Sequence, residues 1–285
     1  MKNNETMKRR HWNIAKILGW TAVPIVLIAL WEIKAWQMQS PWIFPRASAV
    51  AEQLLHPSRD HYNQGSLLSS AAVSLLRVII GFSFAAVVGV TMGLIMGSVR
   101  VIRSLFEPVI ELLRPLCPIA WVPFAIAIFK LTTLPQVFGV RYSKTIFDQV
   151  QIGMLFILFW GAFFPILINT LDGVARVRRD YVTLARMLGA GRVRRFIHVN
   201  LPASMPMILT GLRQGIGVCW FVIIAAEMLP GSSSGIGYLL LYAADQSDMS
   251  IVIASMIIIG GVGAMLNYLI QFSMGRLVHW QGKET

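Results

Sequence analysis

A basic segment beyond the middle of the chain holds the residues best suited to bind a partner. The stretch Thr183–Pro206 reads TLARMLGAGRVRRFIHVNLPASMP and contains a Gly189-Ala190-Gly191 break, two prolines and four arginines. This pattern is typical of a basic, hinged, helix-like segment, and on both sides of it lie runs apolar enough to sit in lipid. Because the whole chain has a net charge of +12, nucleic acid is the first class of partner to consider.

The other reactive side chains form no catalytic or metal-binding pattern. Cys117 and Cys219 lie in or beside apolar runs and predict neither a disulfide framework nor a metal site. The stretch GVRYSKT at 139–145 lacks the glycine that precedes the lysine of a phosphate loop. No Ser/His/Asp set gathers, and the histidines are scattered without metal-ligand spacing: His11, His56, His61, His198 and His279. We therefore expect no catalytic residue, no metal site and no cofactor in this chain.

The composition is that of a membrane protein. Of the 285 residues, 56% are hydrophobic and only 13% are charged, whereas a soluble domain of this length needs more polar surface. A helix crosses a bilayer with roughly 20 apolar residues. Six windows meet this requirement, at about 17–37, 71–97, 118–134, 151–170, 206–229 and 250–273. The sequence therefore predicts an all-α membrane protein with about six transmembrane helices.

Lysine and arginine are distributed unevenly between the two sides of these spans. Seventeen of them fall in one set of segments, which comprises the N-terminal tail, residues 98–117, residues 171–205 and the C-terminus. The opposite set, at 38–70, 135–150 and 230–249, holds four. By the positive-inside rule the first set, with both termini, is cytoplasmic. The basic excess is then topological, and nucleic-acid binding is rejected.

These assignments predict the organisation of the chain. A periplasmic segment at 38–70 is expected to carry a short helix on the membrane surface, and the Gly- and Ser-rich residues 230–249 an outer loop or re-entrant piece. The expected parts are a cytoplasmic tail at 1–16, a first span at 17–37, the segment 38–70, a core membrane domain at 71–275 with five spans, and a cytoplasmic tail at 276–285.

Small residues and charges in the spans suggest packing faces and a possible pathway. Gly89, Gly93 and Gly97 form a stripe that lets another helix approach closely. In the fifth span, small residues occupy one side, and Arg213, Trp220 and Glu227, each seven apart, occupy the other. Charges in a span often mark a transport pathway. Alternatively, Arg213 and Glu227 reach the two interfaces, and Trp220 serves packing or a gate.

The basic segment resembles the EAA loop of permease subunits of bacterial ABC importers, whose pattern is E-A-A-x3-G-x9-I-x-L-P. The spacing fits throughout, although threonine replaces the glutamate, so the role of that glutamate is not carried over. The matching positions are Thr183, Leu184, Ala185, Gly189, Val199, Leu201 and Pro202.

Other stretches are similar to the nitrate/sulfonate/taurine/bicarbonate branch of these importers. They are LRPLCPIAWVP at 113–123, GAFFPILINT at 161–170, and LTGLRQGIGVCWFVIIAAEML followed by GIGYLL. The resemblance covers roughly residues 65–280. One departure is the connection Leu131–Gln151, which is longer than expected for this branch.

The resemblance implies a type I ABC importer architecture in the bacterial inner membrane. The loop at 171–205 would place a coupling helix in a groove of separate ABC ATPase subunits, which bind ATP and Mg. Further implied partners are a periplasmic or lipid-anchored solute-binding protein, membrane lipids, and a second permease copy that forms a homodimer. The implied coupling residues are Asp180, Thr183, Ala185, Gly189, Leu201 and Pro202.

The branch moves small anions, so the resemblance implies a nitrate, bicarbonate or sulfonate substrate. A positive potential along the route would help an anion enter. The candidate pathway residues are Trp121, Asn169, Arg213, Trp220 and Glu227.

Two other classes of protein are the alternatives. A secondary transporter or channel without an ATPase is expected to use intramembrane carboxylates and related halves, but the sequence has no internal repeat. A membrane-embedded enzyme needs clustered His, Asp or Glu at one interface, which the sequence lacks.

Overall fold

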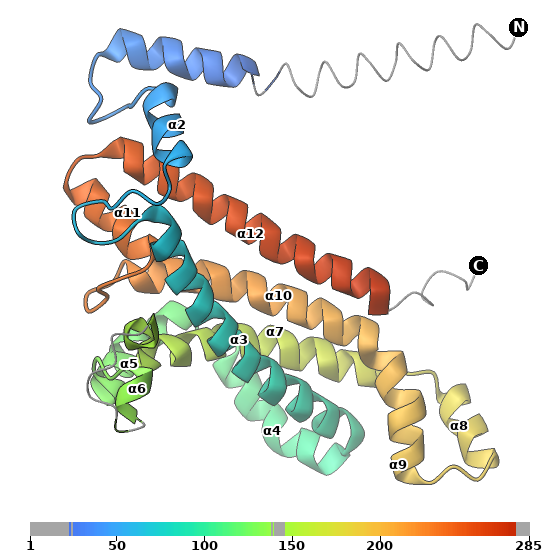
Figure 1. Ribbon diagram of the computed structural model, residues 1–285. Helices are drawn as coiled ribbons and strands as arrows, with labels where there is room; N and C mark the ends of the chain where they lie inside the picture. Colours follow the sequence, from blue (N-terminus) through green and yellow to red (C-terminus); the bar gives the residue numbers. More distant parts are fainter. Residues whose placement is uncertain (1–22, 24, 138, 140–145, 278–285) are drawn as a thin grey trace, which may run out of the picture.

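The computed structural model describes residues 23, 25–137, 139 and 146–277 (Figure 1). Four parts of the chain lie outside the described residues: the tail expected at 1–16, the first residues of the span expected at 17–37, most of the stretch at 139–145, and residues 278–285 of the C-terminal tail.

The described chain is helical, and within it only isolated bridges pair extended residues. A helix through residues 25–38 precedes the first labelled element. The elements that follow are α2 (Ala47–Leu55), α3 (Leu67–Ser98), α4 (Arg100–Leu113), η1 (Pro118–Trp121), α5 (Val122–Phe129), α6 (Leu134–Val137), η2 (Ile146–Gln149), α7 (Ile152–Ala175), α8 (Arg179–Met187), α9 (Arg192–Arg195), η3 (Phe196–Asn200), α10 (Leu201–Glu227), α11 (Ile236–Asp245) and α12 (Met249–Leu277).

Helix α7 forms the centre of the core, with α3 and α10 packed along it (Figure 1). The expected glycine stripe of α3 lies at this contact. A Cβ added to Gly93 would come within 2.7 Å of Thr170 Cβ, and one added to Gly97 would meet Val174 at the same distance. Gly211 and Gly215 of α10 approach α7 just as closely. Within the described chain, these small residues therefore allow contacts inside one subunit.

The span expected at 118–134 is not a single straight helix. The short helices from Pro118 to Phe129 follow α4 after a break and lie at 90° to it. Pro115 and Pro118 explain the break, because neither can donate a helical hydrogen bond. Among the described residues, four helices are long and apolar enough to cross a membrane, or five if this bent pair counts as one span.

The span expected to begin at 206 starts much earlier. Helix α9, the π-helical turn η3 and α10 run on from Arg192 to Glu227 as one element of 36 residues. Pro202 cannot donate to the carbonyl of His198 and would crowd it, so a wider turn just before the proline is the expected local response. At 1.5 Å per residue this element is about 50 Å long.

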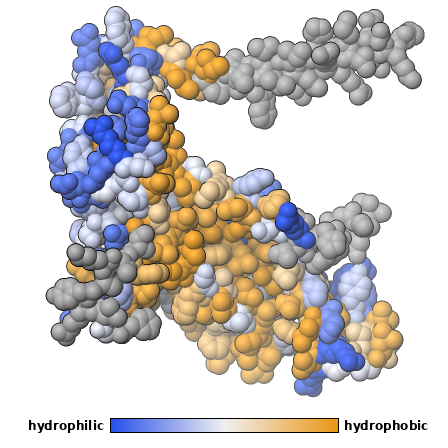
Figure 2. Space-filling view, in the orientation of Figure 1, coloured by the Kyte–Doolittle hydropathy of each residue, from blue (hydrophilic) through white to orange (hydrophobic). Residues whose placement is uncertain are grey.

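The molecule has two distinct ends, which we call the hairpin end, formed by α8 and α9, and the α11 end. Hydrophilic residues gather at both, and a hydrophobic surface extends between them (Figure 2). At the α11 end, α2 packs against α12. The Glu32 carboxylate, from the preceding helix, caps the N-terminus of α2 by accepting hydrogen bonds from the Ala47 and Ser48 amides. Burial and a 2.8 Å hydrogen bond to Asp248 raise the pKa of Tyr62 to about 12.

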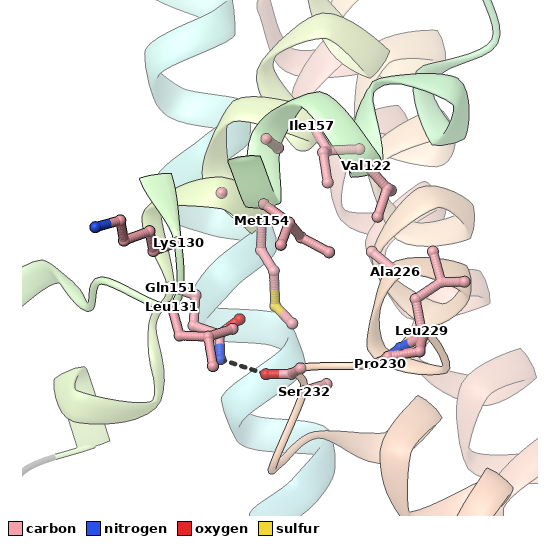
Figure 3. A pocket seen from close by; sticks show the side chains of 14 residues that line it. Val122, Lys130, Leu131, Gln151, Met154, Ile157, Ala226, Leu229, Pro230 and Ser232 are labelled. Carbon is pink, nitrogen blue, oxygen red and sulfur yellow. Dashed lines mark hydrogen bonds between the residues drawn. The ribbon is translucent and has the colours of Figure 1, made fainter. Parts of the chain in front are cut away.

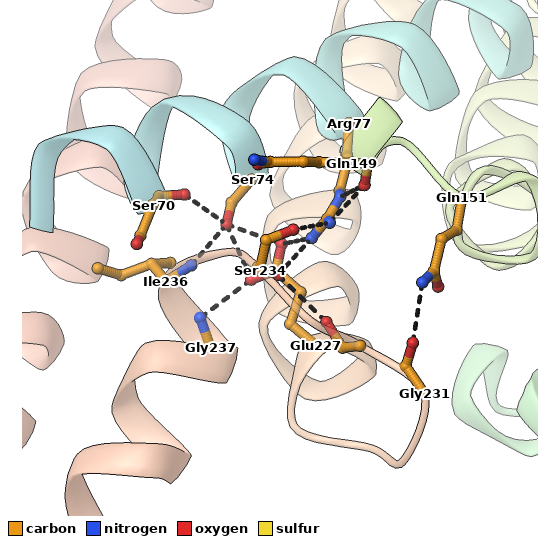
Figure 4. A network of polar contacts seen from close by, with 11 residues as sticks. Ser70, Ser74, Arg77, Gln149, Gln151, Glu227, Gly231, Ser234, Ile236 and Gly237 are labelled. Atoms are coloured by element: carbon orange, nitrogen blue, oxygen red, sulfur yellow. Dashed lines mark hydrogen bonds and ion pairs between the residues drawn. The ribbon is translucent and has the colours of Figure 1, made fainter. Parts of the chain in front are cut away.

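A buried ion pair joins α3 to the end of α10 near the α11 end (Figure 4). Arg77 Nη1 lies 2.6 Å from Glu227 Oε1, and neither residue is exposed. Ser74 donates to the same carboxylate, which also accepts the amide of Gly237 at 3.0 Å. The carboxylate thus holds together α3, α10 and the start of α11.

The arginine of this pair uses all of its donors. Its remaining N–H groups bind the carbonyl of Gln149, just before α7, and the carbonyl and hydroxyl of Ser234, just before α11. A guanidinium has five N–H donors, and each has an acceptor here. Gly235 allows the approach, because a Cβ at this position would overlap the carboxylate of Glu227. The network closes the α11 end of the molecule.

Breaking this pair on one side is expected to destabilise the protein severely. Glu227→Gln leaves the buried Arg77 charge without a counter-charge, which typically costs about 3–5 kcal/mol of unfolding free energy. Replacing both partners, as Arg77→Met with Glu227→Met, should cost less than either single change. Thermal unfolding of the detergent-purified protein measures the order. Arg103→Gln is the control, because the Arg103–Glu107 pair is about 40% exposed; equal melting temperatures for Glu227→Gln and this control would contradict the assignment.

Candidate coupling and translocation site

The α8–α9 hairpin turns at Gly189, the glycine of the loop motif. Helix α8 ends in a Schellman arrangement, in which the Gly189 amide donates to the Arg186 carbonyl and the Ala190 amide to the Ala185 carbonyl, both at 3.0 Å. This geometry requires a left-handed residue, and Gly189 has φ +76°. The break that the sequence shows at Gly189-Ala190-Gly191 is therefore a left-handed turn that ends α8.

Apolar side chains of this hairpin are exposed instead of packed. Met187 and Leu188 are about 80% exposed, and Leu184 and Val193 more than half. A groove of about 370 Å³ separates α8 from the start of α10, with Ala185 and Pro202 on its walls. A short helix that displays apolar side chains in this way is typical of a docking element.

The other expected coupling residues lie on or next to the same hairpin. Asp180 lies in the first turn of α8, its side chain is 79% exposed, and its ionic partner is Arg178 at 3.4 Å. Thr183 is also exposed on α8, whereas Leu201 and Pro202 are half-buried in the first turn of α10. All six expected coupling residues are thus grouped at the hairpin end.

Two of the expected pathway residues lie inside the subunit. Glu227 is committed to the ion pair with Arg77, so its carboxylate neither reaches an interface nor faces an open cavity. Trp220 is 4% exposed, donates its indole N–H to the Ile259 carbonyl at 3.0 Å and packs against Gly263 of α12. Packing, the first of the two roles considered for Trp220, accounts for its position.

Arg213 is partly exposed and paired with a neighbouring helix. Its Nε donates to Asn267 Oδ1 of α12 at 2.7 Å. The side chain is therefore held sideways between α10 and α12 and does not extend along the helix toward an interface.

Asn169 and Trp121 lie closer to open space. Asn169 of α7 donates to Gln214 of α10 at 2.9 Å, and both residues line a cavity near the middle of these helices. Trp121 stacks on Trp160 of α7, with ring centroids 5.4 Å apart and planes at 7°. These two candidates therefore lie near one another, with Trp160 connecting Trp121 to the cavity.

A second, much smaller cavity lies at the α11 end (Figure 3). The side chain of Met154 lies between its two walls, one from α5 and Leu131 and the other from the end of α10, and Gln151 donates to the Gly231 carbonyl at 2.8 Å across one side. Its volume is about 30 Å³, which is roughly the share of one water molecule in the liquid. This cavity is too small for a hydrated solute.

Two polar residues contribute to these contacts although the sequence did not single them out: Arg77, which pairs with Glu227, and Gln214, which binds Asn169. Arg77 is a lone charge in the second apolar window, and Glu227 is a charge of opposite sign in the fifth window. Because opposite charges in spans tend to pair, this combination could have predicted the ion pair. Gln214 follows Arg213 directly, and its partner on α7 could not be read from spacing along one helix.

Comparison with known proteins identifies the family. Residues 85–282 match the family described as the binding-protein-dependent transport system inner membrane component. A putative ABC transporter permease of Methanocaldococcus jannaschii is 41% identical over 91% of both chains. The bicarbonate transport system permease of Synechococcus elongatus is 33% identical, over 89% of this chain and 84% of its own. The nitrate import permease of Synechocystis is 34% identical, over 87% and 84%.

The fold is also that of a solved importer. A bacterial ABC transporter involved in the import of the acidic polysaccharide alginate aligns over 94% of this chain and 99% of its own, with a TM-score of 0.56 and 14% identity. This confirms the expected type I importer fold. The chain belongs to the family of binding-protein-dependent transport system inner membrane components, and is thus a multi-pass permease subunit of an ATP-driven importer.

Proposed function

We propose that this permease forms the translocation pathway for a small anion of the nitrate or bicarbonate class, and that the loop at 180–202 couples it to its ATPase subunits. The α8–α9 hairpin is the observation that carries the coupling proposal. It joins exposed apolar side chains to a turn set by Gly189, and α9 continues without interruption into the long helix α10. A push on the hairpin is therefore transmitted along about 50 Å of helix.

The partners follow from the same arrangement. The described part of one chain holds one such hairpin, whereas an ATPase pair offers two grooves, so two permease copies are proposed, as a homodimer. ATP and Mg would be bound by the ATPase subunits. At the α11 end, a polar hollow of about 430 Å³ is lined by residues such as Asp60, Gln64 and Ser233, and we assign this end to a periplasmic or lipid-anchored solute-binding protein.

The anion class rests on two lines of support. The relatives named above include permeases for bicarbonate and nitrate. In addition, Arg213 places a positive charge within the apolar helix α10, and its hydrogen-bond partner, Asn267, is neutral, which favours a positive potential along a route beside it.

The orientation in the membrane gives a first test. The hairpin end and both termini should be cytoplasmic, and the α11 end periplasmic. A cysteine at Ser233, which is exposed and forms no hydrogen bond with a described residue, should react with an impermeant maleimide in intact spheroplasts. A cysteine at the exposed Arg179 should react only after permeabilisation. Cys117 must be replaced first, whereas Cys219 is fully buried and can remain. The reverse labelling pattern would overturn the orientation.

Gly189 tests the coupling itself. An aspartate at φ +76° is strained by about 1 kcal/mol or more, and nothing lies within 4 Å of the added Cβ, so Gly189→Asp should still insert in the membrane. We expect it to weaken ATPase pull-down and to abolish solute uptake, because the turn that presents the docking helix changes.

Two variants serve as controls for this change. Gly191→Asp adds the same charge in the same loop at an ordinary φ of −63°, where aspartate is a favourable helix N-cap. Arg192→Gln removes one of several exposed charges. Both should retain most of the docking and uptake. Wild-type docking and uptake by Gly189→Asp, at matched expression, would mean that this loop is not the coupling element.

A further inference from the structure

A partly polar cavity near the middle of α7 and α10 lies at the break between α4 and η1. It has a volume of about 300 Å³, against about 30 Å³ for the cavity beside Met154. The walls come from the residues of the break itself and from the middle of α7 and α10. Its polar side chains are Arg114, Trp160, Asn169 and Gln214, and its other walls are apolar.

The hydrogen bonds of Asn169 fix the orientation of the Gln214 amide. The Pro165 carbonyl can only accept, so the Asn169 atom 2.8 Å from it must be the amide nitrogen. The same nitrogen lies 2.9 Å from Gln214, which must therefore present its oxygen to Asn169. The NH₂ group of Gln214 is then left without an acceptor among the described residues. A side chain held in this way presents donors to whatever occupies the cavity.

The other polar groups of the cavity are also donors without partners. The Arg114 side chain forms no ion pair or hydrogen bond with a described residue. The Arg77 side chain, in contrast, uses all of its donors, and that of Arg213 is bound to Asn267. The indole N–H of Trp160 is buried and has no acceptor in the described chain. A buried donor without an acceptor is unfavourable, so an acceptor in the cavity would be stabilising.

The cavity therefore has the charge and hydrogen-bonding character of an anion site. None of the residues that line it is acidic, and one is a permanent cation, since arginine does not lose its proton in proteins. In surroundings this apolar, a charge-assisted hydrogen bond is roughly twice as strong as a neutral one. The break in the helix makes the space, because side chains of a continuous helix would fill it.

We propose that this cavity is a binding site for a small oxyanion in transit, in which Arg114 supplies the charge and the NH₂ group of Gln214 a directed hydrogen bond. Asn169 acts as a positioning residue that orients Gln214. This proposal rests on the proposed function and adds to it the residues that contact the substrate. Of the residues expected to line the pathway, it keeps Asn169 in a supporting role and replaces Arg213 with Arg114.

The test uses the complete importer, with its ATPase and solute-binding protein, in liposomes. Uptake of labelled nitrate and of labelled bicarbonate is measured together with ATP hydrolysis. Arg114→Gln removes the charge, and Gln214→Glu replaces the NH₂ donor by a negative oxygen of nearly the same shape. Each should lower uptake at least tenfold, whereas ATP hydrolysis without solute should stay within twofold of wild type, because the hairpin is unchanged. Arg114→Lys should restore most of the uptake.

Arg100→Gln is the matched control, since Arg100 lies on the same helix α4, has no described ionic partner and is not part of the cavity. It should transport like wild type. If Arg114→Gln and Gln214→Glu transport either anion within twofold of wild type, the site is wrong and the proposed function stands. If Arg114→Gln and Arg100→Gln lower uptake equally, Arg114 acts only as an interfacial charge, and the proposal is also wrong. If the wild-type importer takes up neither anion, the proposed substrate class fails, and the site fails with it.

Discussion

The Arg77–Glu227 ion pair is the constraint on which the α11 end of this permease depends. Two opposite charges inside an apolar protein are tolerated only when both are paired and the remaining donors have acceptors. Here this requirement is met by backbone and side-chain groups of four separate segments: α3, the last residue of η2, the end of α10 and the start of α11. No two of these segments can separate without exposing a charged group to an apolar environment. The loop between α10 and α11 is therefore held in place, although its composition is that of a flexible loop.

The helical element that ends at this network begins at the α8–α9 hairpin. From Arg192 to Glu227 the chain contains one π-helical turn but no break, and glycines on α10 and α3 let both helices lie closely against α7. Close packing makes such a group of helices stiff, because neighbouring side chains cannot move independently. A displacement at the hairpin must then either tilt the whole group or be absorbed at the π-helical turn. This turn lies directly before Pro202, between the hairpin and α10.

The sequence predicted much of this arrangement, and the remaining features have physical reasons. Hydropathy located α3, α7, α10 and α12, because a helix that crosses the lipid can be recognised from the apolar composition of about 20 consecutive residues. Glycine spacing predicted close helix contacts, and the Gly189-Ala190-Gly191 break marked the place where the α8–α9 hairpin turns. Hydropathy could not show that the helical element ending in α10 begins at Arg192, because a helix continues through charged residues as long as its backbone hydrogen bonds do. Periodicity along one helix also could not identify the partners of Glu227 and Asn169. These partners, Arg77 and Gln214, lie on other helices, and they meet Glu227 and Asn169 only through packing between segments far apart in sequence.

The break between α4 and α5 and the cavity beside it depend on one another. Pro115 and Pro118 remove two amide donors, and the backbone between the helices keeps only part of its helical bonding, through the Arg114, Leu116 and Ala120 amides. The carbonyl groups left without partners are costly in lipid, and irregular backbone at membrane depth is tolerated where it lines a water-filled space. A cavity at this break therefore stabilises the bent form of the chain. The bent chain, in turn, places the Arg114 side chain, which sits at the last turn of α4, in the same cavity as the amides of α7 and α10. The irregular backbone and the placement of an unpaired cation beside the middle of α7 and α10 are thus two consequences of the same pair of prolines.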